Sequence, residues 1–201
     1  MENMLGNAGN DINNTPDTKK SALSDFIEFL ELFVIAISLV IVVFSCFVRL
    51  CVVDGPSMEN TLYHGERLLV SEFFCEPEAN DIVVFHQTGK YYNQPIVKRV
   101  IAVGGEKVHI EYGKHTMQIT VTDANGKDRI LEEPYIKMVD ADIYSAPFTV
   151  EVPEGKLFVL GDNRNHSSDS RAYTIGLVDE RRVLGKVFFR VLPIPRFGTV
   201  N

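Results

Sequence analysis

An uninterrupted apolar run near the start of the chain constrains the fold more than any other feature. Residues 32–48 carry no charged side chain, and Ser38 and Ser45 are the only polar residues among them. A helix of that length spans roughly 25 Å, close to the thickness of the hydrocarbon core of a bilayer. A helix that is apolar on every side is seldom hidden in a soluble domain of this size. The run therefore predicts a single membrane span.

The predicted anchor extends beyond the run at both ends. Residues 21–31 read as the start of the helix, and residues 50–53 continue it past Arg49, whose long side chain can reach the membrane interface. We therefore expect an anchor helix over residues 21–53. A cleaved signal peptide is the alternative. Its apolar part is usually shorter, roughly 7–15 residues, and no small-residue cleavage signal follows the run here, which favours an uncleaved anchor.

The residues before the anchor indicate a tail and an orientation. Residues 1–20 are rich in Asn, Gly and Asp and almost lack large apolar side chains, so we expect them to be disordered. Lys19 and Lys20 precede the span, whereas Arg49 follows it. Because positive charges favour the cytoplasmic side, this asymmetry predicts a cytoplasmic N-terminus and places residues 54–201 outside.

Residues 54–201 predict a mostly β domain. Short runs with β-branched or buried-strand character are separated by turn signals such as Gly113 and Asn125-Gly126. Frequent short strands with such turns are typical of an antiparallel sheet or barrel and not of a parallel α/β domain. The predicted strands cover residues 67–70, 81–85, 96–103, 108–111, 117–121, 148–152, 156–160 and 183–192.

The charge and the cysteine content of the chain argue against a nucleic-acid partner, a disulfide framework and a metal site. The net charge of −7 and the pI near 5.2 argue against a nucleic-acid partner, which needs a clustered basic surface. The cysteines Cys46, Cys51 and Cys75 are odd in number, match no metal-binding spacing, and two of them lie in or beside the apolar run. We therefore expect neither a disulfide framework nor a metal site.

Ser57 follows the apolar segment closely, in the sequence Gly55-Pro56-Ser57-Met58. Gly55 permits unusual backbone dihedral angles and Pro56 fixes its own φ, so together they can hold the serine rigidly. The tripeptide is also an ordinary loop sequence. Because a serine hydroxyl is a poor nucleophile until a base takes its proton, a catalytic role for Ser57 requires a partner.

Lys98 is the candidate base. It lies in the middle of a predicted strand, where alternation places it with Ile96 and Val100 on one side. Burial disfavours the ammonium ion, so it lowers the lysine pKa and leaves a neutral amine available as a base. A strand-edge lysine in water is the alternative. The 5 histidines are scattered, and no His/Asp pair presents itself as a triad.

A polar segment, residues 161–171, directly follows a predicted apolar strand. Within it Asp169 and Arg171 can pair and pin the loop, and the Ser167 hydroxyl can hold a nearby amine. A plain surface turn or an ion site is the alternative, although the segment lacks the acidic ligand that ends an EF-hand loop.

Four ordered blocks after the span resemble the bacterial type I signal peptidases, membrane-anchored serine proteases that use a Ser-Lys dyad. Each block alone is weak evidence for the resemblance. The four blocks in this order cover most of residues 32–192 and together make a specific match. They are Gly55-Pro56-Ser57-Met58 with Thr61-Leu62, residues 81–85, Val97-Lys98-Arg99-Val100-Ile101 with Gly104-Gly105-Glu106, and Gly161-Asp162-Asn163-Arg164 with Ser167, Asp169, Ser170 and Arg171.

The resemblance implies a membrane-bound serine endopeptidase, single-pass in the bacterial cell membrane, that removes signal peptides from secreted preproteins after small-x-small sites by way of an acyl-enzyme. It implies Ser57 as nucleophile and Lys98 as general base. Such a reaction needs no metal or organic cofactor, and the implied partners are preproteins and the lipid bilayer. An inactive relative that only binds signal peptides as a membrane-tethered β-domain is the alternative, but it would normally have lost Ser57 or Lys98.

Supporting roles also follow from the resemblance alone. Ser167 corresponds to the serine that orients the lysine, Asp169 and Arg171 to a pair that shapes the site, and Met58 to the residue packed beside the nucleophile. One strand is implied to pair with the extended substrate and to line its pockets. Its residues are Asp81, Ile82, Val83, Val84 and Phe85.

The chain also departs from the family pattern. Gly55 stands where many relatives carry an oxyanion-hole serine, so the Ser57 backbone N–H is the only donor that can be assigned. Asn60 replaces the usual proline, and residues 107–149 are the least family-like, which suggests a variable insertion. We further expect residues 62–74 to present Tyr63, Phe73 and Phe74 to the membrane interface.

Overall fold

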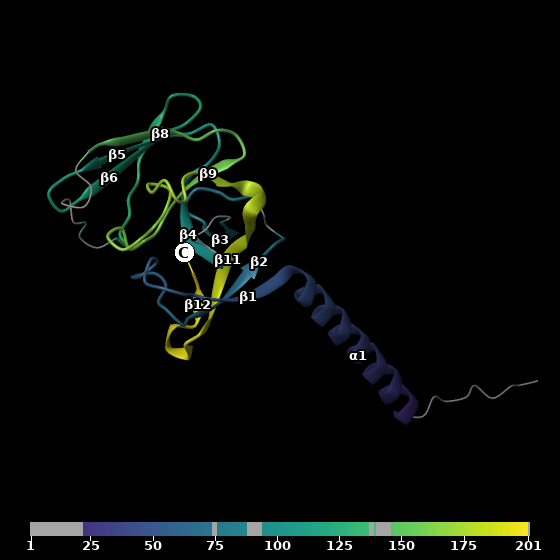
Figure 1. Ribbon diagram of the computed structural model, residues 1–201. Coiled ribbons are helices and arrows are strands. Elements are labelled where there is room, and N and C mark those ends of the chain that lie inside the picture. The colour runs from purple at the N-terminus through teal and green to yellow at the C-terminus, as the bar shows by residue number, and fades with distance from the viewer. Residues whose placement is uncertain (1–21, 74–75, 88–93, 137–138, 140–145, 201) are drawn as a thin grey trace, which may run out of the picture. The chain divides into compact units, whose positions relative to one another are not determined.

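The computed structural model describes residues 22–73, 76–87, 94–136, 139 and 146–200 (Figure 1). The expected disordered tail, residues 1–20, lies outside these ranges. The chain divides into two compact units, residues 1–43 and 44–201. Helix α1 (Ala22–Phe47) buries none of its residues, and by length and composition it is the one helix in the described ranges that can cross a membrane. It matches the predicted apolar anchor.

The predicted anchor is too long at its C-terminal end. Helix α1 ends at Phe47, and the next residues form strand β1 (Val48–Val52), which pairs along its whole length with β2 (Arg67–Ser71). The β-branched Val48 and Val52 favour an extended backbone. Arg49 forms an ion pair with Glu72. The expectation that residues 50–53 continue the helix is therefore wrong, because the extended segment forms backbone pairs with β2.

The larger sheet has eight strands, and all its pairings are antiparallel. Its order is β1-β2-β11-β3-β4-β9-β10, with β12 on β11. This confirms the predicted fold class. The bounds are β3 (Ile82–His86), β4 (Pro95–Ala102), β9 (Lys156–Leu160), β10 (Val178–Asp179), β11 (Val183–Leu192) and β12 (Gly198–Thr199), with 3-10 helices η2 (Glu180–Arg182) and η3 (Ile194–Arg196).

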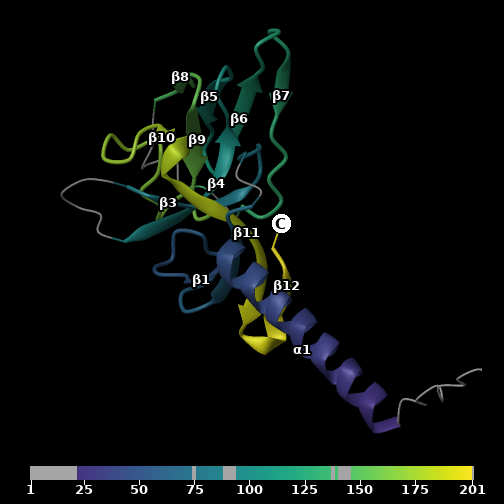
Figure 2. The ribbon, with the colours of Figure 1, turned by 90° about the vertical axis from the view of Figure 1, so that its right-hand side faces the viewer.

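The smaller sheet lies within residues 107–151, most of which belong to the segment expected to be a variable insertion. Its order is β7-β6-β5-β8, and Figure 2 shows these strands gathered at one end of the β unit. The bounds are β5 (Lys107–Tyr112), β6 (Met117–Thr122), β7 (Asp128–Ile130) and β8 (Phe148–Glu151). The predicted turns at Gly113 and Gly126 are confirmed. Strands β8 and β9 flank residues 153–155, but they belong to different sheets.

The alternation of β3 and β4 separates two parts of the hydrophobic core. Ile82, Val84 and Val97 pack in one cluster with Met58, whereas Val83, Phe85 and Val100 pack in another, with Ile96 at its margin. The predicted sides of β4 are therefore confirmed. Each fully buried aliphatic side chain stabilises the fold by about 1.5–3 kcal/mol, so β3 and β4 hold Lys98 in a stable part of the sheet.

Candidate active site

The structure brings Ser57 and Lys98 together although they lie 41 positions apart. The Nζ atom of Lys98 is 2.6 Å from Oγ of Ser57, and it also donates a hydrogen bond of 3.0 Å to the carbonyl of Val97. Lys98 is 2% exposed, and Ser57 is half-buried in the turn that follows β1. The hydroxyl of the half-buried Ser57 therefore faces the buried amine of Lys98.

Burial changes the acidity of this amine. It lowers the pKa of Lys98 from 10.5 to about 8, while the negative charges of Asp169 and Asp162 raise the pKa and offset part of that effect. At pH 7 roughly one tenth of the amine is therefore uncharged, far more than for a lysine with the ordinary pKa. An uncharged amine within hydrogen-bond reach of a hydroxyl can take its proton.

The loop after β9 holds the backbone of the nucleophile. Asn163 donates two hydrogen bonds of 3.1 Å, from its backbone N–H to the Ser57 carbonyl and from Nδ2 to the Pro56 carbonyl. Gly161 lies directly against the same Ser57 carbonyl, and a Cβ atom at this position would overlap both that oxygen and Oγ of Ser167. The close approach of the two segments therefore requires glycine at position 161.

Asp169 and Arg171 form the pair that their spacing allows. Nε and Nη2 of Arg171 each donate to a different Asp169 oxygen at 2.8 Å, and Oδ2 of Asp169 also accepts from the Gly161 N–H at 3.1 Å. Both side chains are almost fully buried. Because Asp169 holds Gly161, the pair fixes the loop at the point where it touches Ser57.

Ser167 lies close to the site but makes a different contact from the expected one. Its Oγ atom packs beside Gly161, is buried, and has no hydrogen-bond partner within the described ranges. The expected hydrogen bond to Lys98 is therefore not formed. The hydroxyl is held at the edge of the site with its bonding capacity unused.

Met58 and β3 were both expected around the nucleophile. Met58 is 1% exposed and packs in the core with Ile82 and Val84. The expectation that β3 pairs with an extended substrate is wrong, because β3 already has β11 on one side and β4 on the other. Asp81, which precedes β3, forms a 2.7 Å ion pair with Lys186.

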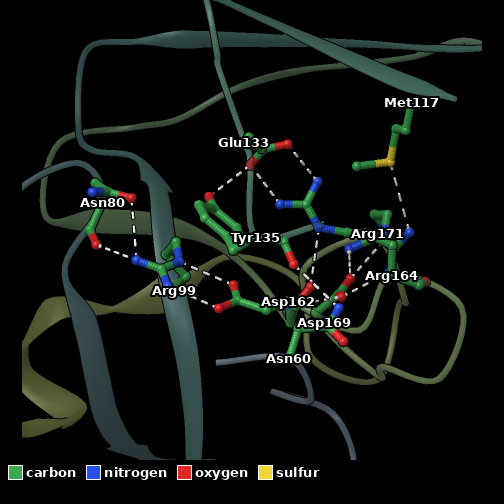
Figure 3. A network of polar contacts seen from close by, with 11 residues as sticks. Asn60, Asn80, Arg99, Met117, Glu133, Tyr135, Asp162, Arg164, Asp169 and Arg171 are labelled. Carbon is green, nitrogen blue, oxygen red and sulfur yellow. Dashed lines mark hydrogen bonds and ion pairs between the residues drawn. The ribbon is translucent and has the colours of Figure 1, made fainter. Parts of the chain in front are cut away.

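Sequence reasoning assigned no role to a buried ionic network next to Lys98. Arg99 donates two hydrogen bonds, of 2.9 and 2.8 Å, to Asp162, and neither side chain is exposed. Figure 3 shows Arg99 between Asn80 and Asp162, and Glu133 between Tyr135 and Arg164. An arginine among the apolar residues of a predicted strand was the available signal, because a buried guanidinium requires a buried carboxylate.

The arrangement suits nucleophilic acyl transfer. The backbone N–H of Ser57 donates to no group in the described ranges, so it is free for an oxyanion that develops beside Oγ. The described residues contain no group of three or more His, Cys, Asp or Glu side chains that could hold a metal ion.

Comparisons with known proteins point to one family. A family model described as "Signal peptidase, peptidase S26" matches residues 26–192. The chain is 35% identical to signal peptidase IB of Staphylococcus aureus, over 86% of this chain and 93% of the relative. It is 34% identical to probable signal peptidase I-1 of Synechocystis, over 74% of each chain. A crystal structure of a signal peptidase I from Enterococcus faecalis matches at 33% identity with a TM-score of 0.40, over 55% of this chain and 96% of that one.

Proposed function

Because the chain belongs to the S26 family of signal peptidases, we propose that it is a membrane-bound serine endopeptidase that removes N-terminal signal peptides from secreted preproteins. The observation that carries the proposal is the 2.6 Å contact between the buried Lys98 amine and Ser57 Oγ. Family membership supplies the reaction class, and the contact supplies a nucleophile with its base.

The proposed reaction passes through an acyl-enzyme. The neutral Lys98 amine takes the proton of Ser57 as Oγ bonds to the carbonyl carbon of the small residue before the cleaved bond. The resulting ammonium gives that proton to the amide nitrogen as the C–N bond breaks, and the mature protein leaves as an amine. Lys98 then takes a proton from water as the water oxygen bonds to the ester carbon. It returns that proton to Oγ of Ser57 as the ester C–O bond breaks, which releases the signal peptide as a carboxylic acid and restores both side chains.

The oxyanion has one assigned donor, the Ser57 N–H. Gly55, which has no side-chain donor, uses its own N–H for a 3.2 Å hydrogen bond to Nδ1 of His64. Since one oxyanion donor is typically worth about 3 kcal/mol in the transition state, the Ser57 N–H contributes substantially to the rate.

We assign substrate pairing to β4 in place of β3. Strand β9 pairs with β4 only from Arg99 onward, so the residues from Ile96 to Lys98 have β3 on one side and no strand partner within the described ranges on the other. An extended peptide that adds to this edge passes the Lys98 amine. The buried side chain of Met58, the residue after Ser57, favours small side chains near the cleaved bond.

The membrane is the second proposed partner. The anchor holds the enzyme where signal peptides are embedded, which raises the effective substrate concentration. Tyr63 is 41% exposed and Phe73 is 65% exposed, as a lipid-touching surface requires, whereas Phe74 lies outside the described ranges. We propose that residues 54–201 lie on the outer face of a bacterial cell membrane, with the N-terminus in the cytoplasm.

Substrate class and orientation can be tested separately. The intact chain in detergent is expected to cut a preprotein with alanine at positions −3 and −1, leaving the mature N-terminus, and to spare the same preprotein with phenylalanine at −1. Equal cleavage of both would contradict the small-residue preference. Protease added outside intact spheroplasts is expected to digest residues 54–201, and protection of this region would contradict the orientation.

A further inference from the structure

We propose that residues 131–136 form a strap that positions the Ser57–Lys98 pair, with Glu133 and Tyr135 as positioning residues; this rests on the proposed function. The strap continues from β7 and runs back toward the larger sheet (Figure 2). Its first residue is anchored in the smaller sheet, because the Leu131 N–H donates to the Ile119 carbonyl at 2.9 Å. A turn closes its other end, where the Ile136 N–H donates to the Glu133 carbonyl at 3.0 Å.

The strap first contacts the loop that supports Ser57. Glu133 accepts two hydrogen bonds from Arg164, of 2.9 and 2.6 Å, and the side chains are 9% and 1% exposed. Nε of Arg164 donates at 3.0 Å to the carbonyl of Gly161. Because Gly161 lies against the Ser57 carbonyl, a chain of direct contacts runs from Glu133 to the nucleophile.

The strap next contacts the strand that carries the base. The guanidinium of Arg99 lies 4.2 Å from the centre of the Tyr135 ring. Arg99 directly follows Lys98 and is itself fixed by Asp162. The Tyr135 hydroxyl donates at 3.0 Å to Glu133, which joins the two contacts into one network (Figure 3). Burial, together with the charge of Glu133, raises the pKa of Tyr135, so this hydroxyl keeps its proton.

The strap finally contacts the turn that carries the nucleophile. Nδ2 of Asn60 donates at 3.1 Å to the Tyr135 carbonyl. Asn60 has a φ of 87°, in the left-handed region that asparagine tolerates and proline cannot adopt. The asparagine at this position therefore permits the turn and ties it to the strap.

One short segment thus touches the nucleophile turn, the base strand and the loop behind them. A purely structural segment would lower stability when weakened, and the remaining folded molecules would react at the normal rate. A positioning segment behaves differently, because a displacement of about 1 Å between reacting groups can cost roughly 100-fold in rate while leaving the protein folded.

The test compares Glu133→Gln and Tyr135→Phe with the intact chain in detergent. Glu132→Gln is the matched control, because it makes the same chemical change at an exposed neighbouring residue. For each protein we would measure kcat and KM for a small-x-small preprotein, the rate of Ser57 acylation by a small activated ester, and the folded fraction at the assay temperature.

We expect Glu133→Gln to lower kcat and the acylation rate per folded molecule by about 10-fold and Tyr135→Phe by about 3-fold, with KM within about 2-fold. Glu132→Gln should match the intact chain. The positioning role of the strap would be overturned if the loss of activity merely followed the loss of folded protein. It would also be overturned if both variants kept normal rates. An intact chain that is acylated at Ser57 but cuts no preprotein would contradict the proposed function, and the acylation rates would still decide the strap. An intact chain that is not acylated overturns both.

Discussion

Nζ of Lys98 lies 2.6 Å from Oγ of Ser57, with the lysine buried in β4 and the serine on the turn after β1. The geometry pairs a hydroxyl with an amine whose pKa depends on burial.

The pH dependence of kcat/KM should follow the lysine. Burial lowers the Lys98 pKa to about 8, and the proposed mechanism requires the neutral amine. Activity should therefore rise about 10-fold per pH unit well below pH 8 and level off above it. The measurement is initial cleavage rate at low substrate concentration across pH 6 to 10. A limb centred near the ordinary histidine pKa of about 6.5 would point to another base.

Burial of Lys98 should also cost stability. Its pKa is about 8 in the folded chain, below the ordinary value of 10.5, so the folded state binds fewer protons between these pH values and stability rises with pH there. Lys98→Met should raise the free energy of unfolding by about 3 kcal/mol at pH 7, and this gain should disappear above about pH 10.5. Denaturant unfolding at both pH values checks it. Lys107→Met, at a half-exposed side chain, is the control; a pH-independent gain at Lys98 would contradict the prediction.

Gly161→Ala should lower kcat per folded molecule strongly, beyond any loss of activity that comes from a lower folded fraction. The added Cβ would overlap the Ser57 carbonyl and Ser167 Oγ, which displaces the nucleophile. Gly104→Ala is the matched control, because its Cβ would overlap Glu154, whose contacts lie outside the dyad. We expect at least a roughly 100-fold lower kcat for Gly161→Ala and a normal rate per folded molecule for Gly104→Ala. Equal kcat in the two variants would show that the Gly161 contact does not position Ser57.

Ser167→Ala tests the unused hydroxyl beside Gly161. We propose that Oγ accepts a hydrogen bond from the Lys98 ammonium once the proton has moved, since it has no other partner in the described ranges. Loss of one such bond should lower kcat by about 10-fold with KM unchanged. Ser168→Ala, at the exposed neighbouring serine, should keep the normal kcat. Identical kcat in both variants would leave Ser167 with a packing role only.

Features set by local pattern could be predicted from the sequence. The apolar run identified α1, and period-two alternation placed Ile96 and Val97 of β4 on opposite sides of the strand. The pairing of Asp169 with Arg171 also follows from two charges on one short loop. Each of these depends on residues close together in the chain.

Features set by long-range pairing could not be predicted in this way. Residues 48–53 are apolar enough for either a helix or a strand, and only β2 decides between them. The partners of β3 depend on β11, which comes about one hundred residues later. Glu133 and Tyr135 are ordinary residues in the least family-like segment, and their contacts with Arg164 and Arg99 exist only in the folded chain.

The most direct measurement is cleavage of a small-x-small preprotein in detergent by the intact chain, Ser57→Ala and Lys98→Ala. We predict that the intact chain cuts after the small residue and that each variant is slower by at least about 1,000-fold, because the two side chains act as a unit. If Lys98→Ala cuts at the same site and rate as the intact chain, the base is another group and the Ser57–Lys98 mechanism is wrong.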